Sequence, residues 1–210
     1  MAELSITCNE PAGVIDSGET PRLLLHCCCA PCASSVLEKL SADFCITAFF
    51  YNPNITPYAE YDRRAGEFDK LPFRESYKNP VNLTVCGYDP EPFTEAAASF
   101  WNEPEGGARC RACFALRLGE TAKTASIGGY DCFTTTLSVS PYKDAALINE
   151  IGSNLERELG VKYLSSDFKK RDGFKRSIEL SKQYDLYRQS YCGCAPSMNA
   201  NIVRSNGHQV

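Results

Sequence analysis

Residues 23–40 read LLLHCCCAPCASSVLEKL. An apolar run ends at His26, three adjacent cysteines follow, and a fourth, Cys32, comes just before a helix-forming segment. Because a short apolar run bounded by a loop is typical of a buried strand, we predict a strand over Leu23–His26 and a helix over Ala33–Leu40. The cysteines then lie in the loop at the carboxyl end of the first strand.

Strand-like and helix-like segments alternate along the rest of the chain. Further strands are predicted over residues 44–51, 81–86, 132–137 and 161–164. Further helices are predicted over residues 58–71, 93–101, 145–159, 174–184 and 195–203, and around Cys110 and Cys113. This alternation predicts an α/β fold, a mostly parallel, Rossmann-like sheet with helices on both faces. Ligands of such sheets bind beyond the carboxyl ends of the strands, so we expect a metal site there.

The bulk properties predict one domain of ordinary composition. With 210 residues the chain is long enough for a single α/β metalloenzyme domain over residues 21–210, preceded by a mobile lead-in over residues 1–20. The net charge of -4 argues against a protein that coats nucleic acid without specificity. The lead-in lacks the pattern of a signal peptide and no apolar run is long enough to span a membrane, so we expect a cytoplasmic protein.

The cysteines carry the strongest chemical signal. Of 12 in the chain, eight fall into three tight thiol groups: Cys27, Cys28, Cys29 and Cys32; Cys110 and Cys113; and Cys192 and Cys194. Thiolates select zinc, Cu(I) and iron–sulfur clusters, so metal binding or dithiol redox chemistry is the first hypothesis. The isolated Cys45, Cys86 and Cys132 lie in strand-like runs and are predicted to be core residues.

The second thiol group has the spacing of a metal half-site. Cys110 and Cys113 would share one face of a helix, close to its positively polarised start, which favours thiolates. Together with two thiols of the first group they would form a four-thiolate site for zinc or a cubane cluster. Arg109 and Arg111 are expected to offset the negative charge of such a site. Structural zinc sites usually combine two Cys-x-x-Cys motifs, whereas one half of this site would consist of adjacent cysteines. This difference favours an iron–sulfur cluster over zinc.

Two other functions fit parts of the pattern. Cys29 and Cys32 form a Cys-x-x-Cys motif between a strand and a helix, as in thioredoxin-like dithiol oxidoreductases, but that function leaves Cys110 and Cys113 without a role. A zinc-bearing RNA-binding module is the other alternative. In the third thiol group, Gly193 allows a tight turn, so Cys192 and Cys194 can form a reducible disulfide or chelate a metal.

Several motifs, in order, resemble one known family, the cobalamin-independent epoxyqueuosine reductases called QueH. The resemblance extends from about Leu23 to Cys194. It rests on HCCCAPC at 26–32, FYNPNI at 50–55, EYDRR at 60–64, RCRAC at 109–113, FTTTL at 133–137 with SPYK at 140–143, and YRQSYCGC at 187–194.

The resemblance implies reduction of epoxyqueuosine to queuosine in the anticodon loop of tRNA, with an electron donor as a further partner. It also implies that Cys28, Cys29, Cys110 and Cys113 hold a [4Fe-4S] cluster. Cys192 and Cys194 would be the catalytic redox pair, or ligands of a second, mononuclear iron next to the cluster. Cys32 would belong to that second site, where some relatives carry Asp.

The same resemblance suggests which residues contact the tRNA. Aromatic stacking on a splayed base and cations on phosphates are the usual means of holding a single-stranded loop. The predicted substrate contacts are Tyr51, Asn52, Asn54, Lys143, Arg188 and Gln189. Charge alone marks a basic run at residues 169–176, KKRDGFKR, as the best candidate for a tRNA-docking surface on an otherwise acidic chain, and a solvated helix face is the alternative.

Overall fold

The computed structural model describes residues 20–72 and 77–206, and the side chains up to residue 200. The predicted lead-in falls almost entirely on residues 1–19, which lie outside the described residues, so that prediction stays open. Within the described residues, no helix combines the length and the apolar character that crossing a membrane requires.

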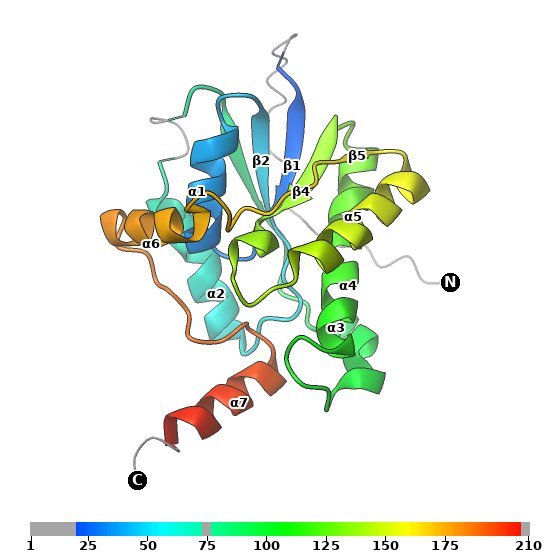
Figure 1. Ribbon diagram of the computed structural model, residues 1–210, viewed down its shortest axis with the longest axis vertical. Coiled ribbons are helices and arrows are strands. Elements are labelled where there is room, and N and C mark those ends of the chain that lie inside the picture. The colour runs from blue at the N-terminus through cyan, green and yellow to red at the C-terminus, as the bar shows by residue number, and fades with distance from the viewer. Residues whose placement is uncertain (1–19, 73–76, 207–210) are drawn as a thin grey trace.

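Five strands form one sheet in the order β3-β2-β1-β4-β5, and every neighbouring pair is parallel (Figure 1). The strands are β1 (Arg22–His26), β2 (Cys45–Phe50), β3 (Val81–Val85), β4 (Cys132–Thr135) and β5 (Lys162–Tyr163). The predicted α/β fold with a parallel sheet is confirmed. The strand order reverses between β1 and β4, and the carboxyl ends at such a switch point form a crevice where ligands bind.

Helices cover both faces of the sheet because alternate residues of each strand point to opposite faces. The α-helices are α1 (Ala30–Leu40), α2 (Tyr58–Gly66), α3 (Glu91–Ala97), α4 (Ala108–Ile127), α5 (Ala145–Leu159), α6 (Gly173–Gln183) and α7 (Ala195–Asn206). Short 3-10 helices are η1 (Glu67–Lys70), η2 (Ala98–Phe100) and η3 (Thr136–Val139). Leu23 and Leu25 of β1 pack in the core beneath α1, and Leu24 packs in the core beneath α4 and α5.

Most element boundaries differ from the sequence prediction by a few residues, and two of these differences bear on the site. Helix α1 begins at Ala30 instead of Ala33, because Pro31 occupies the start of the helix, where its missing N–H costs nothing. Strand β4 ends at Thr135 instead of Leu137, because the Thr135 hydroxyl accepts a hydrogen bond from Leu137 N and begins η3. Cys32 is therefore helical, and Thr136 turns toward the thiol loop.

Candidate metal centre

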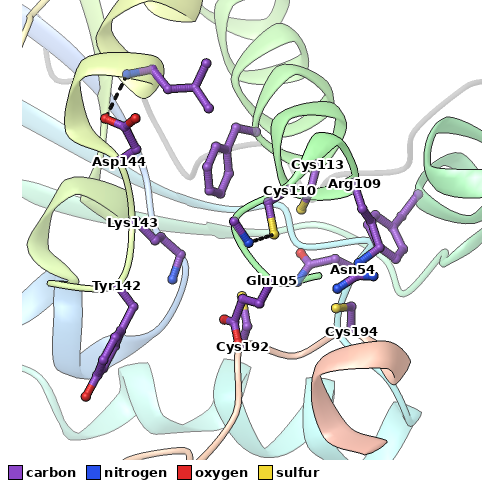
Figure 2. Close-up of a pocket in the computed structure, with 14 residues that line it drawn as sticks. Asn54, Glu105, Arg109, Cys110, Cys113, Tyr142, Lys143, Asp144, Cys192 and Cys194 are labelled. Atoms are coloured by element: carbon purple, nitrogen blue, oxygen red, sulfur yellow. Dashed lines mark hydrogen bonds between the residues drawn. The ribbon is translucent and has the colours of Figure 1, made fainter. Parts of the chain in front are cut away.

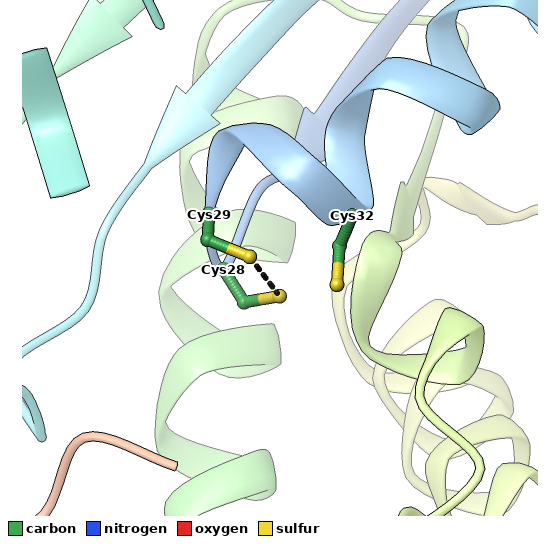
Figure 3. Close-up of side chains that lie close together, drawn as sticks. All are labelled: Cys28, Cys29 and Cys32. Carbon is green, nitrogen blue, oxygen red and sulfur yellow. Dashed lines mark hydrogen bonds between the residues drawn. The ribbon is translucent and has the colours of Figure 1, made fainter. Parts of the chain in front are cut away.

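The first thiol group lies at the switch point of the sheet, where β1 ends. The Sγ atoms of Cys28, Cys29 and Cys32 all lie within 4.8 Å of one another, and those of Cys28 and Cys29 are 3.9 Å apart (Figure 3). Cys29 is the N-cap of α1 and Cys32 lies in its first turn. The positively polarised end of α1 therefore faces the three sulfurs and stabilises negative charge on them.

The neighbouring strand fixes which cysteines face the site. The Cys28 backbone N–H donates to the Thr136 hydroxyl at 3.1 Å, and that hydroxyl lies 3.4 Å from Cys28 Sγ. Cys27 points the other way: it is fully buried in the core beneath α1 and its thiol donates to the Leu25 carbonyl. Cys27 is therefore a core residue, whereas Cys28 belongs to the centre.

The three thiols ionise unequally because they share one negative charge. Contacts with the Cys29 and Cys32 thiols hold the pKa of Cys28 well below its usual value. The resulting thiolate raises the pKa of Cys29 to about 11 and also raises that of Cys32. The group thus offers one thiolate readily, and a bound cation would be needed to draw protons from the other two.

The second and third thiol groups face each other across a small cavity of about 40 Å³. Figure 2 shows Cys110 and Cys113, from the start of α4, opposite Cys192 and Cys194, from the loop before α7. The Gly106 N–H donates to Cys110 Sγ at 3.2 Å. Burial raises the pKa of both helix cysteines, that of Cys113 to about 12, so metal binding would have to displace their protons.

The loop that carries Cys192 and Cys194 is fixed by the 54–57 segment and by α2. Gly193 adopts a φ of 129°, and its carbonyl accepts a hydrogen bond from Thr56 N at 2.9 Å. Arg64, buried in α2, donates to the Cys192 carbonyl at 3.1 Å and forms an ion pair with Glu60. The chain bends at Gly193 with the positive φ that glycine permits, and both thiols are free.

A larger cavity of about 610 Å³ adjoins the small one. Cys28, Cys32 and Cys192 line it, and both cavities share Cys192 and Lys143. All three thiol groups therefore line two adjoining cavities at the carboxyl ends of β1 and β4, although Cys28 and Cys194 are 166 residues apart in the sequence. This confirms the expected location of the cysteine groups relative to the sheet.

Lys143 and Arg117 are two of the cations that line these cavities. Burial alone would lower the pKa of Lys143, but negative charge on Cys192, Cys28 and Cys32 raises it above its ordinary value. Arg117 lies 3.9 Å from Cys113 Sγ through its Nη1 atom. Of the two arginines expected to offset the thiolate charge, Arg111 forms an exposed ion pair with Glu150 instead. Arg109 lines the small cavity, where its charge opposes the rise in the pKa of Cys110, and it donates to backbone carbonyls of the loop before α4.

The predicted substrate contacts divide into two classes. Lys143, Arg188 and Gln189 line the larger cavity, and Gln189 also donates to Cys29 Sγ at 3.2 Å; Asn54 lines the small cavity. Tyr51 and Asn52 are instead buried. Tyr51 stacks on Phe49, and Asn52 donates to the Cys27 carbonyl and accepts from Arg117.

Arg64 and Arg117 are the site residues that sequence reasoning did not single out. A signal for Arg117 was present: it follows Cys113 by four positions, so the two share a face of α4. Arg64 carried no such signal, because its contact with the Cys192 carbonyl joins segments 128 residues apart.

The donor set fits a soft metal centre. Three sulfurs already converge, further thiols face the adjoining cavity, and buried cations stand where thiolate charge would build up. Among the described residues, the one group of three or more potential ligand side chains within coordinating range contains only cysteines. Thiolate ligands of this kind suit iron–sulfur clusters and zinc better than hard cations.

Comparison with known proteins shows which family this chain resembles. The model of the family described as epoxyqueuosine reductase QueH matches residues 23–200. A curated epoxyqueuosine reductase QueH from Staphylococcus epidermidis is 45% identical over 183 residues, which cover 84% of this chain and 76% of the relative. The protein of that name from Streptococcus pyogenes is 42% identical over 176 residues, covering 83% and 69%. The one from Thermotoga maritima is 35% identical over 196 residues, covering 89% and 98%.

Proposed function

The chain belongs to the epoxyqueuosine reductase QueH family, and from that membership we propose that it reduces epoxyqueuosine to queuosine in the anticodon loop of tRNA. The observation that carries the proposal is the convergence of three separate cysteine segments on two adjoining cavities at the carboxyl ends of the strands. Opening the epoxide to an alkene consumes two electrons and two protons and releases water, so the site must handle both.

The cysteines would divide this work. Cys28, Cys29, Cys110 and Cys113 would hold a [4Fe-4S] cluster, and Cys32 would serve a second, mononuclear iron. The cluster, when bound, supplies electrons one at a time from an electron donor. Cys192 and Cys194 would act as a redox dithiol: forming their disulfide releases two electrons and two protons, which matches the demand of the substrate.

The larger cavity would receive the modified base. Lys143 and Arg188 place positive charge along it, and Tyr142, which is 86% exposed, stands at the border of both cavities. An exposed aromatic ring beside these cations suits a base splayed from a single-stranded loop, with its phosphates nearby. Asn54 supports the same view, because its buried Oδ1 atom has no hydrogen-bond partner among the described residues and the residue lines the thiol cavity.

The experiment uses anaerobically prepared protein, a chemical reductant and tRNA that carries epoxyqueuosine. Mass spectrometry of the digested tRNA should detect the loss of one oxygen atom from the modified nucleoside. Cys192→Ser and Cys194→Ser should abolish this product and retain most of the cluster absorbance. Cys45→Ser, at the amino end of β2, is the control and should turn over normally. An iron-loaded parent protein that never forms queuosine would refute the proposal.

A further inference from the structure

Arg117 is a buried cation in an unusual setting. Its side chain is only 2% exposed, yet it lies on α4 between the thiol groups. The guanidinium makes three described contacts: Nε donates to His26 Nε2 at 3.3 Å, Nη2 donates to Asn52 Oδ1, and Nη1 lies 3.9 Å from Cys113 Sγ. Two of these partners are neutral, and the third is a thiol.

No carboxylate forms an ion pair with Arg117 in the part of the chain that the structure describes. Arg64 is a useful contrast, because it is equally buried but pairs with Glu60 at 2.7 Å. A buried charge without a counter-charge is costly, so a compensating negative charge is expected nearby. The groups that face Arg117 from the site are cysteines: Cys113 Sγ lies 3.9 Å from Nη1, and Cys28 and Cys192 line the larger cavity together with Arg117.

We infer that Arg117 is a positioning residue whose buried charge compensates the thiolate-held metal group and makes that group easier to reduce. The inference rests on the proposed function, since it presupposes a redox group on these cysteines. It differs from a role in folding alone, because it predicts a change in reduction potential.

Electrostatics gives the direction in which Arg117 shifts the reduction potential. Adding an electron makes the thiolate-held group more negative, and a fixed positive charge at close range in a low-dielectric interior stabilises the reduced form. The contacts of Arg117 preserve that charge. Asn52 is neutral and anchored to the Cys27 carbonyl at 2.9 Å, so its contact with the guanidinium does not cancel the charge. The full charge therefore remains available to the sulfurs.

The first test compares Arg117→Gln with Arg117→Lys in reconstituted protein. Iron content is measured first, and the midpoint potential is then measured by redox titration followed by electron paramagnetic resonance. The Gln variant, which lacks the charge, should be at least about tenfold harder to reduce, equal to about 59 mV for a one-electron couple. The Lys variant keeps the charge and should remain closer to the parent potential.

Asn52→Asp tests the same charge without removing the arginine. The substitution keeps the size of the side chain and places a carboxylate in contact with the guanidinium. The midpoint potential should therefore fall, as in Arg117→Gln. Asn79→Asp is the matched control. Asn79 donates to the Ala42 carbonyl near the amino end of β3, away from the thiols. The midpoint potential of this variant should equal that of the parent protein.

The outcomes separate this inference from the proposed function. A parent protein without iron would refute the cofactor, whereas a loaded parent with unchanged potentials in Arg117→Gln and Asn52→Asp would refute the role of Arg117 alone. If neither of those variants loads iron but Arg117→Lys does, the charge is required and the inference holds. If Arg117→Lys also fails to load while remaining folded by circular dichroism, the hydrogen bonds matter and the inference is wrong.

Discussion

Gly193 decides the geometry of the third thiol group. Its φ of 129° is one that side-chain-bearing residues rarely adopt. A Cβ atom there would lie 3.0 Å from Ile55 Cγ1 and 3.1 Å from Asn54 Nδ2. The chain can therefore bring Cys192 and Cys194 to the same cavity only because the residue between them has no side chain.

Gly193→Ala is therefore expected to lower the free energy of unfolding by about 1–3 kcal/mol and to cost most of the turnover, because the loop must shift with its two thiols. Urea denaturation measures the first effect and the tRNA assay the second. Gly66→Ala is the control, since a Cβ at this helical position of α2 meets nothing within 4 Å. Normal activity in Gly193→Ala would show that the loop geometry is not critical.

At the scale of elements, α5 packs closely against β5 because a glycine of the helix leaves room for a tyrosine ring of the strand. Gly152 is buried in α5, and a Cβ there would lie 2.4 Å from the ring of Tyr163 in β5. The same ring packs on Phe133 of β4, 5.1 Å between centroids, and its hydroxyl donates to Asn149. Because the ring is held on several sides, it cannot move away cheaply.

Gly152→Ala should therefore lower the free energy of unfolding by about 1–3 kcal/mol, the usual cost of overpacking a core. Gly119→Ala, in the middle of α4, provides the matched control, because a Cβ there meets nothing within 4 Å. Alanine has the higher helix propensity, so that variant should gain about 0.5–1 kcal/mol. Equal stabilities of the two variants in urea denaturation would contradict this description of the α5–β5 contact.

The sequence predicted these elements well because their signals are local. Hydrophobic runs and the stop at Gly160 predicted α5 with its observed bounds. The sequence could not predict the side-chain contacts of the site that join segments far apart in the chain. The Thr136–Cys28 contact joins two strand ends 108 residues apart, and the Arg117–Asn52 contact joins α4 to the loop after β2. The cysteine groups were visible in the sequence, and Arg109 does line the thiol cavity, but Arg111 pairs with Glu150 instead, and Arg117 was not expected at the site.

At the scale of the whole molecule, the basic run at residues 169–176 is less basic than its sequence indicates. Lys169 and Lys170 both pair with Asp167, at 3.1 and 3.3 Å, and Arg176 pairs with Glu38 and Glu179. Its role as the tRNA-docking surface stays a prediction. The cations that line the larger cavity, Lys143 and Arg188 among them, are the other source of phosphate contacts.

Binding of tRNA at several salt concentrations distinguishes these surfaces. If the run docks tRNA, replacing Lys169, Lys170 and Arg171 by Ala should weaken binding. The slope of log affinity against log salt should also flatten, by about 0.7 for each phosphate of a single-stranded loop that the variant no longer neutralises. Iron content should not change. An unchanged slope would assign the phosphate contacts to the cavity cations instead.

The central claim is that cysteines from the loop after β1 and from α4 hold one metal group, while Cys192 and Cys194 serve the chemistry. The most direct measurement is the iron content of anaerobically prepared variants. The parent protein should carry about four irons per chain, or more if the second site is filled. Cys110→Ser and Cys113→Ser should lose most of that iron, and Cys192→Ser and Cys194→Ser should keep it. Full iron in both helix variants, or its complete loss in either loop variant, would contradict the claim.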